Sequence, residues 1–151
     1  MIKLEHPNYR PAVRIREGRE QIFDSLRRKW LVLTPEEWVR QYFISYLLHV
    51  MQYPPAWIAV EKLIRVNGLR KRFDAVVYGR DLKPLVLVEC KQMDEELNEA
   101  VIRQLLQYNV ALKAGFLVAT NGIHCLGFDI RSGTAEHLME LPDPMKLFGP
   151  A

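Results

Sequence analysis

Several features that mark common protein classes are missing from this sequence of 151 residues. No run approaches the roughly 20 apolar residues that a membrane helix needs, and the N-terminal segment is too charged to be a signal peptide. The two cysteines, Cys90 and Cys125, lack the spacing of a disulfide framework or a zinc site. Repeats, low-complexity tracts and linkers are also absent. We therefore expect a cytoplasmic protein with reduced thiols that does not contact a membrane.

A large excess of charge of one sign is missing as well. Lys and Arg number 21 against 18 Asp and Glu, which gives a net charge of +3 at pH 7. This excess suits an anionic partner, but it is common among proteins that never touch nucleic acid. The chain does have 49% hydrophobic residues, enough for one domain over residues 1–151. We expect an N-terminal extension at 1–30 with a short strand and a helical turn or two, a core at about 30–130, and a tail at 140–151.

The first half of this core predicts a helix followed by three strands. The helix should run from about Pro35 to Met51, because Thr34 can cap its N-terminus and Glu37 occupies the capping-box position. Between residues 57 and 91, three β-rich runs are separated by Asn67-Gly68 and by a polar turn. This pattern is typical of an antiparallel meander.

The second half predicts a crossover helix and further strands. Apolar residues recur at helical spacing over about residues 94–115, with Gly115 as a stop. Two short strands follow around Asn121-Gly122, and residues 134–141 add an edge strand. A strand that follows a crossover helix lies parallel to the strand before it, so the sheet should be mixed. The predicted fold class is α/β, with one open sheet covered by helices.

A buried strand that ends in charged residues carries the candidate chemistry. In PLVLVECKQ, residues 84–92, the alternation of a strand puts Glu89 and Lys91 on one face and Cys90 on the other. Asp74 precedes Glu89 by 15 residues on the neighbouring strand, where the hairpin would bring the two carboxylates together. Mg²⁺ usually takes one or two carboxylates and keeps several waters. Such a metal stabilises charge on a phosphate and lowers the pKa of an attacking water, which the lysine could position.

This pattern resembles the D…(D/E)xK core of the restriction-endonuclease-like, or PD-(D/E)xK, nuclease superfamily. Over roughly residues 30 to 130 the chain is similar to the N-terminal nuclease domain of type I restriction enzyme R subunits. Four segments carry that similarity: LTPEEWVRQYFISYLL, VEKLIRVNGLRKRFDAVVY, LVLVECK and IRQLLQYNVALKAGFLVATNG. The fold it implies is a restriction-endonuclease-like mixed β-sheet flanked by helices. Phe73 stands where the superfamily's name-giving proline would be, and the helicase motor of R subunits does not follow in this sequence.

The resemblance also implies roles for individual residues. Asp74 and Glu89 would hold the metal, with the backbone carbonyl of Cys90 as a further ligand, and Lys91 would serve the nucleophilic water. A glutamate of the first helix often completes the site in related nucleases, and Glu37 suits this role better than its neighbour Glu36 because it lies on the apolar face.

Further residues match elements that contact nucleic acid. Gln104 and Tyr108, four positions apart, match the QxxxY element of RecB-like nucleases, which implies contact with the phosphate backbone or support of Lys91. The basic run of Arg70, Lys71 and Arg72 precedes Asp74 on a hairpin and could grip a phosphate backbone, although such a run is usually a solvated surface.

Each of these residues also has a purely structural explanation. Glu89 and Lys91 could form a surface salt bridge worth at most about 1 kcal/mol. A capping box fully explains Glu37. Glu61 could face the site, but an exposed strand glutamate beside Lys62 is the more frequent situation. A surface amide and a partly buried aromatic ring would equally account for residues 104 and 108.

The sequence thus predicts a Mg²⁺-dependent endonuclease, with Mn²⁺ expected to substitute, that hydrolyses phosphodiester bonds in DNA by metal-activated water. One alternative is a nucleic-acid-binding or assembly module that keeps the fold and needs restriction-system partners to cut. In another, only the fold is shared and the acidic cluster is structural. The choice between DNA and RNA stays open, as do strandedness and specificity. A double-strand cut by a one-site domain would suggest a homodimer or two sequential nicks.

Overall fold

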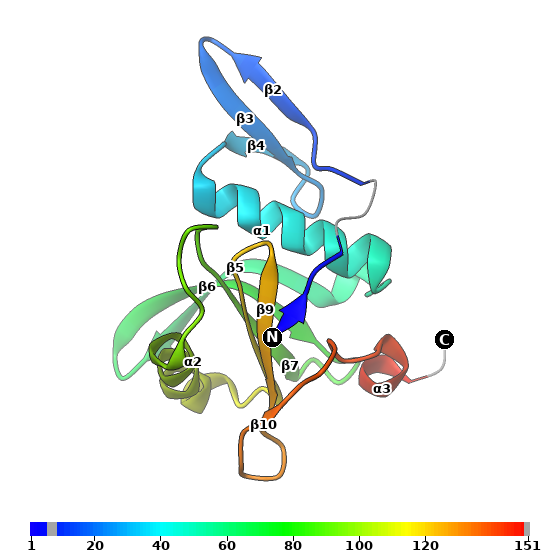
Figure 1. The fold of residues 1–151 in the computed structure, drawn as a ribbon, viewed down its shortest axis with the longest axis vertical. Helices are drawn as coiled ribbons and strands as arrows, with labels where there is room; N and C mark the ends of the chain where they lie inside the picture. Colours follow the sequence, from blue (N-terminus) through cyan, green and yellow to red (C-terminus); the bar gives the residue numbers. More distant parts are fainter. Residues whose placement is uncertain (6–8, 150–151) are drawn as a thin grey trace.

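The computed structural model describes residues 1–5 and 9–149, which form one long open sheet, the helices packed on it and a smaller sheet beyond α1 (Figure 1). The strand order of the main sheet is β1-β9-β8-β7-β6-β5, with β10 paired to β9. β7 and β8 are parallel and the other recorded pairs are antiparallel, which confirms the predicted mixed α/β sheet. The strands are β1 (Ile2–Lys3), β5 (Ile58–Val66), β6 (Leu69–Tyr78), β7 (Pro84–Cys90), β8 (Phe116–Thr120), β9 (His124–Asp129) and β10 (Glu136–His137).

The smaller sheet is built from the N-terminal region. We call its strands β2 (Val13–Arg16), β3 (Arg19–Asp24) and β4 (Lys29–Val32) the N-terminal meander. Glu17 and Gly18 both have positive φ, 53° and 76°, as a tight two-residue hairpin turn requires. The expectation of helical turns in this region was wrong. In β2 apolar and polar residues alternate with a period of two, and pairing among the three strands satisfies their backbone groups.

Two longer helices pack on the main sheet. α1 (Pro35–Ser45) begins where predicted, with the Thr34 hydroxyl accepting the N–H of Glu37 at 3.0 Å. It ends earlier than predicted, because the chain continues as a π-helical turn over Tyr46–Val50. α2 (Glu99–Leu112) is capped by the Asn98 side chain and ends at the left-handed residue Lys113, two residues before the predicted stop. Two shorter helices complete the set, a 3-10 turn at Pro55–Trp57 and α3 (Pro144–Phe148).

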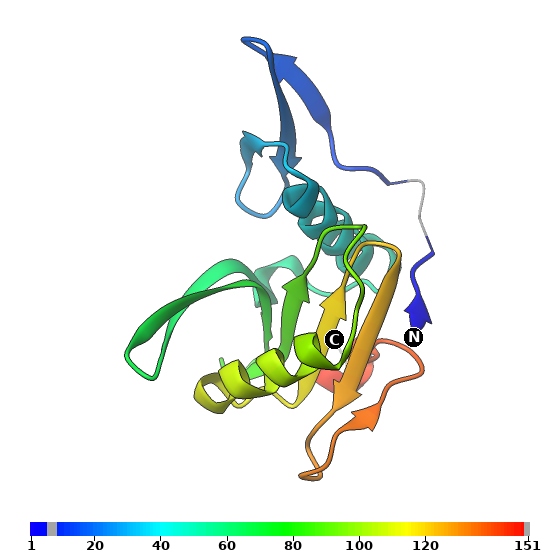
Figure 2. The ribbon, with the colours of Figure 1, turned by 60° about the vertical axis from the view of Figure 1, so that its left-hand side comes forward.

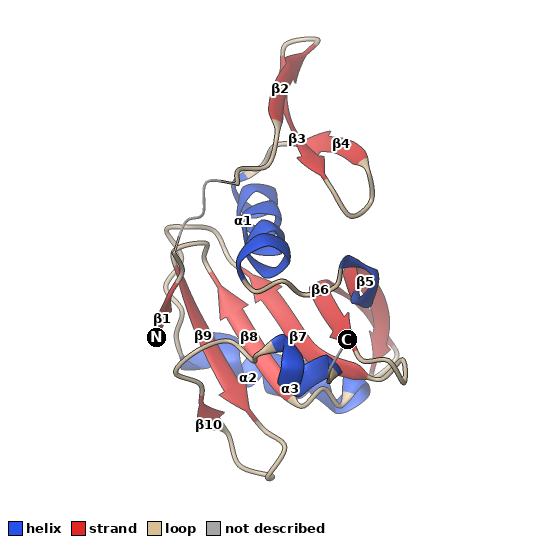
Figure 3. Cartoon of the chain, turned by 90° about the vertical axis from the view of Figure 1, so that its right-hand side faces the viewer, coloured by secondary structure: helices blue, strands red, loops and turns tan. Residues whose placement is uncertain are grey.

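The helices divide the core between the two faces of the sheet. Val39 and Phe43 of α1 belong to one buried cluster, together with Val88 of β7. Leu105 of α2 belongs to a second cluster, together with Leu87. Phe148 of α3 lies in the first cluster, and Figure 3 shows α2 and α3 on opposite sides of the sheet. Among the described residues, no helix is long and apolar enough to cross a membrane.

The β5–β6 hairpin projects away from the rest of the sheet (Figure 2). Asn67 and Gly68 form its turn with positive φ angles of 51° and 77°, as their sequence predicts. Glu61 has a φ of 50°, which is unusual inside a strand and interrupts the regular pairing of β5. Its neighbours Val60 and Lys62 pair with residues 75 and 73, so Glu61 lies level with Asp74.

Candidate active site

Asp74 and Glu89 meet where β6 and β7 end their pairing. Ala75 pairs with Val88 in antiparallel register, so Asp74, just before Ala75, and Glu89, just after Val88, come together. Both side chains are buried, at 4% and 6% exposure. Asp74 Oδ2 accepts the backbone N–H of Cys90 at 2.8 Å, which ties one carboxylate to the strand that carries the other.

The Glu89 carboxyl is the least compensated group of the site. Burial raises the pKa of Glu89 to about 8, helped by the charge of Asp74 and a hydrogen bond with it, while Lys71 and Lys91 act in the opposite direction. Its Oε2 atom is buried and has no hydrogen-bond partner among the described residues. Lys71 Nζ lies 3.9 Å from that oxygen. Two buried carboxylates with one unpartnered oxygen favour a shared proton, or a cation in its place.

Arg40 of α1 reaches into the same site. Its Nε and Nη2 atoms donate to Asp74 Oδ1 at 3.0 and 2.7 Å, and its Nη1 donates to Glu37 Oε1 at 2.6 Å. Glu61 Oε1 lies 3.3 Å from the same Nη1 atom. Burial disfavours the guanidinium charge, yet these carboxylates hold the pKa of Arg40 above its usual value. Sequence reasoning missed Arg40, although an arginine three residues after Glu37 on an otherwise apolar helix face was a signal.

Glu37 contacts this arginine and lies on the buried side of α1. Its Oε2 atom accepts the Gln41 side-chain amide at 3.1 Å, whereas the Glu36 side chain is 49% exposed. Arg40 thus connects Glu37 with Asp74. Among the described residues, no three His, Cys, Asp or Glu side chains lie close enough to hold one metal ion. Protein ligands here would be the two carboxylates and backbone oxygen.

Gln104 and Tyr108 approach the site from the other face of the sheet, through Lys71. The Gln104 amide donates to the Tyr108 hydroxyl at 3.2 Å. Lys71 Nζ lies 4.8 Å from the centre of the Tyr108 ring, and the buried Phe73 ring packs edge-on against that ring at 5.9 Å. Phe73 therefore supports the aromatic ring on which Lys71 rests.

The predicted basic run divides between the two faces of the β5–β6 hairpin. Lys71 pairs with Ile64, which packs on the cluster of α2, so it faces Glu89 and Tyr108. Arg70 pairs with Arg65, and Arg72 pairs with Leu63 on the same opposite face. These arginines are exposed. Sequence reasoning missed Arg65, which joins them only once the strands are in register.

Ion pairs link the site to the N-terminal meander. Arg27 Nη1 lies 2.6 Å from Glu61 Oε2, and Arg27 Nε lies 2.6 Å from Asp24 Oδ2. Burial would raise the pKa of Glu61, but Arg27 and Arg40 hold it below its usual value. The expectation that Glu61 is merely an exposed strand glutamate was therefore wrong.

The two cysteines lie on either side of β8. Cys90 of β7 and Cys125 of β9 both pair with Thr120, and both thiols are free and buried. Burial raises the pKa of Cys125 to about 12 and that of Cys90 well above its usual value. Lys91 directly follows β7, and its backbone N–H donates to the Thr120 carbonyl at 2.8 Å.

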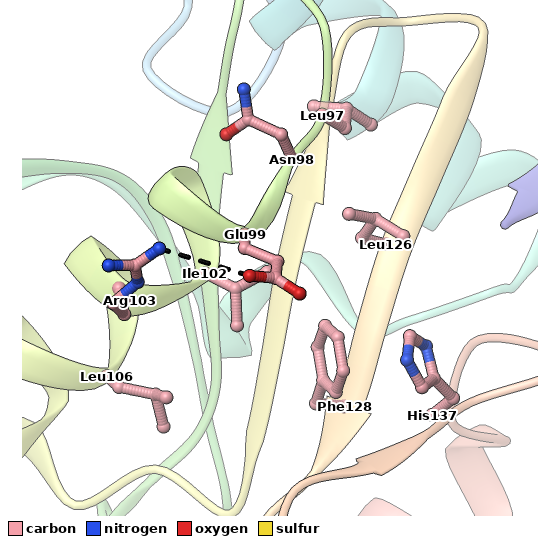
Figure 4. Close-up of a pocket in the computed structure, with 9 residues that line it drawn as sticks. All are labelled: Leu97, Asn98, Glu99, Ile102, Arg103, Leu106, Leu126, Phe128 and His137. Atoms are coloured by element: carbon pink, nitrogen blue, oxygen red, sulfur yellow. Dashed lines mark ion pairs between the residues drawn. The ribbon is translucent and has the colours of Figure 1, made fainter.

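One pocket on the surface lies away from these residues. Figure 4 shows it between α2, β9 and β10, with Leu97, Leu126 and Phe128 in its wall and the 3.9 Å ion pair of Arg103 with Glu99 at its side. None of the predicted site residues lines it. This pocket is therefore not part of the candidate site.

Comparison with known proteins agrees with this architecture. The family model for the N terminus of type I restriction enzyme R proteins matches residues 35–143. Among solved structures, the fragment of a protein assigned as the HsdR subunit of a type I restriction enzyme from Vibrio vulnificus is similar, with a TM-score of 0.55 and 22% identity. The likeness covers 76% of this chain and 24% of that one. The comparison with curated proteins found no match.

The fold and the family match lead to one identification. A mixed sheet with flanking helices, a fold shared with the HsdR fragment, defines the class as an α/β domain. The chain belongs to the family of type I restriction enzyme R protein N-terminal domains. It spans about a quarter of the length of the solved relative.

Proposed function

We propose that the chain is a metal-dependent nuclease of the PD-(D/E)xK type that hydrolyses phosphodiester bonds in DNA. The observation that carries the proposal is the buried pair of Asp74 and Glu89, with a Glu89 oxygen that accepts no hydrogen bond from the described residues and with Lys91 two residues further along the chain. Such a pair fits Mg²⁺, or Mn²⁺ in its place, with the Cys90 carbonyl as a further ligand. When bound, the ion would supply charge stabilisation at the phosphate and a water of lowered pKa.

The chain's own residues prepare this site before a substrate arrives. The Cys90 N–H and the Arg40 guanidinium each hold one oxygen of Asp74, so its carboxylate cannot rotate freely. Lys91 shares the face of Glu89, where it would orient the attacking water. Lys71, resting on Tyr108, would contact the phosphate backbone together with Gln104, and the exposed Arg70 and Arg72 would contact it from the other face of the hairpin.

Cleavage assays with matched variants test the proposal. Supercoiled, linear and single-stranded DNA would be incubated with the protein in Mg²⁺, Mn²⁺ and EDTA. D74N and K91A should reduce cutting by about a thousandfold or more, because each removes a group that acts on the reacting atoms. R103A, on the exposed surface of α2, should cut like the wild type. Melting temperatures would verify folding, since Asp74 also partners Arg40. Normal cutting by K91A or D74N would remove the assignment.

A partner-dependent module is the second candidate, because the chain spans only 24% of its solved relative. In this case the domain would bind DNA and require other subunits of a restriction system, or a second copy of itself, before it cuts. It would act in the cytoplasm like the nuclease. Binding that persists in EDTA, with no cleavage in either metal, would favour this candidate over an independent enzyme.

A further inference from the structure

The net positive charge of the protein comes from its N-terminal meander and the residues beside it. Residues 9–32 contain seven Lys or Arg against three Asp or Glu, an excess of four, whereas the rest of the chain has 14 against 15. The acidic three are Glu17, Glu20 and Asp24, of which Asp24 is buried and bonded to Arg27. The meander also lies outside residues 35–143, the segment shared with the family.

Strand alternation sorts this charge onto one side of the sheet. Val13 pairs with Ile22, which is fully buried on the side of α1. Because side chains alternate along a strand, the residues one position before or after Val13 and Ile22 point away from α1. This second side, which we call the basic face, contains Arg14, Arg16, Arg19, Gln21, Phe23, Trp30 and Val32.

One end of the basic face is held rigid by its own contacts. Arg14 Nε donates to Gln21 Oε1 at 2.8 Å, and the Arg14 guanidinium lies 4.1 Å above the centre of the Trp30 ring. The Phe23 ring meets Trp30 edge-on at 5.2 Å. A stacked, hydrogen-bonded arginine loses little freedom when it binds an anion, so this end is prepared for a ligand.

The other end carries two arginines that face each other. Arg16 and Arg19 are direct partners across the β2–β3 hairpin, both exposed, with no ion pair to any described residue. Like charges opposite each other on a sheet destabilise it. They line a shallow pocket with Gln21 and Val32, and Glu17 in the turn is the one acidic side chain there. An anion placed between the two guanidinium groups would relieve this repulsion.

The meander is fixed to the candidate active site by ion pairs. Arg27 joins Asp24 of β3 to Glu61 of β5, and Glu61 shares Arg40 with Asp74. A polymer held on the basic face would therefore have a defined position relative to the two carboxylates. Regularly spaced phosphates are the anions that suit a line of arginines beside an aromatic ring.

From these contacts we infer that the basic face of the N-terminal meander binds the phosphate backbone of nucleic acid. This inference rests on the proposed function, since it gives the nuclease a second surface that holds its substrate outside the β5–β6 hairpin. The contacts are to phosphates, so binding is independent of base sequence and weakens with salt.

The test uses the full chain in EDTA, so that no cutting occurs. R16Q/R19Q removes two charges that have no partner in the described fold. K83Q/K146Q removes two exposed lysines elsewhere and serves as the charge-matched control. Fluorescence anisotropy with a duplex DNA of random sequence would give Kd at several salt concentrations. R16Q/R19Q should weaken binding roughly tenfold near 0.1 M salt and reduce the slope of log K against log salt by about two. The control should stay within about twofold of wild type.

Two further results decide the inference separately from the nuclease assignment. R16Q/R19Q should melt at or above the wild-type temperature, because the repulsion is gone. If this variant binds duplex and single-stranded DNA as tightly as the control, the inference is wrong, whether or not the wild type cuts. If the wild type fails to cut in any metal while R16Q/R19Q alone loses binding in EDTA, the proposed nuclease fails and the inference stands.

Discussion

Arg40 and Arg16 are the same kind of side chain in opposite environments, one buried among carboxylates and one exposed to solvent. Arg40 is 8% exposed and donates to Asp74 and Glu37, with Glu61 also within ion-pair distance. Arg16 is exposed and faces another arginine across its hairpin. A buried charge requires partners within the fold, because a charged group that has lost its hydration and has no partner strongly destabilises the folded state. An exposed arginine without a partner costs the fold little and is free for a ligand.

The same contrast divides the two carboxylates of the site. Asp74 receives the Cys90 N–H on one oxygen and Arg40 on the other. Glu89 has a buried oxygen with no hydrogen-bond partner among the described residues, only Lys71 Nζ at 3.9 Å, and its pKa is raised to about 8. Under the proposed function, Glu89 is therefore the group whose environment would be completed from outside the chain, by a proton or by a cation.

Removing Arg40 should have the largest effect on the free energy of unfolding. R40A leaves buried Asp74 and Glu37 without their cation, so the free energy of unfolding should fall by about 3–5 kcal/mol. R16A should change it by less than about 0.5 kcal/mol, as a surface substitution does. Urea unfolding followed by circular dichroism measures both. Equal small losses would show that burial does not distinguish the two arginines.

The pH dependence of stability sharpens the contrast between the carboxylates. In the metal-free protein Glu89 keeps its proton up to about pH 8, whereas the unfolded chain releases it near the ordinary value of 4.5. The folded state thus binds more protons in this interval, so the free energy of unfolding should fall as pH rises from about 4.5 to 8. E89Q lacks this proton and should give a flatter profile. Urea titrations in EDTA at several pH values measure the free energy of unfolding of the wild type and of E89Q. The same pH dependence in both would contradict the raised pKa of Glu89.

Metal binding should release the proton that Glu89 holds in the metal-free protein. At pH 7 a cation that takes the place of this proton should release about one H⁺ from Glu89 in the wild type. Titration calorimetry with Mn²⁺ in two buffers of different ionisation enthalpy counts the protons released. D74N should bind Mn²⁺ weakly, and a wild type that binds Mn²⁺ without releasing a proton would mean that Glu89 is not the ligand.

The smallest effect is expected on the face of α2. Y108F removes the hydroxyl that accepts the Gln104 amide but keeps the ring beneath Lys71, so stability should fall by about 1 kcal/mol or less. Y108L also removes the ring and should therefore weaken DNA binding more than Y108F does. Similar DNA affinities for the two variants would show that the ring does not position Lys71.

The fold could be predicted largely because its signals are local. The turn at Asn67-Gly68, the N-cap Thr34 and the apolar run before Glu89 each depend on a few neighbouring residues. The π-helical turn after Ser45 could not be predicted, because it follows no local sequence rule. The helical turns expected before residue 30 were wrong because three short strands stabilise one another across the meander, which is a tertiary effect.

The same distinction applies to the candidate site. The proximity of Asp74 to Glu89 followed from the β6–β7 hairpin, in which Ala75 pairs with Val88, and the contact of Gln104 with Tyr108 from helical spacing. Arg40 and the linking ion pairs of Arg27 and Glu61 join elements distant in sequence, 34 residues apart in each case. No periodicity reveals such contacts before the elements are placed. Their roles in binding and cleavage stay predictions that the experiments above test.

Because Cys90 is buried, its rate of chemical modification would report how often the end of β7 opens. The thiol follows Glu89 directly and has a pKa far above its usual value, so a reagent that needs a thiolate cannot react with it in the closed fold. Each modification at this residue would therefore count one excursion in which the end of β7 separates from its neighbours. Because Cys125 is also free and buried, a colour-forming thiol reagent applied to a C125S variant would report on the strand end beside the candidate ligands.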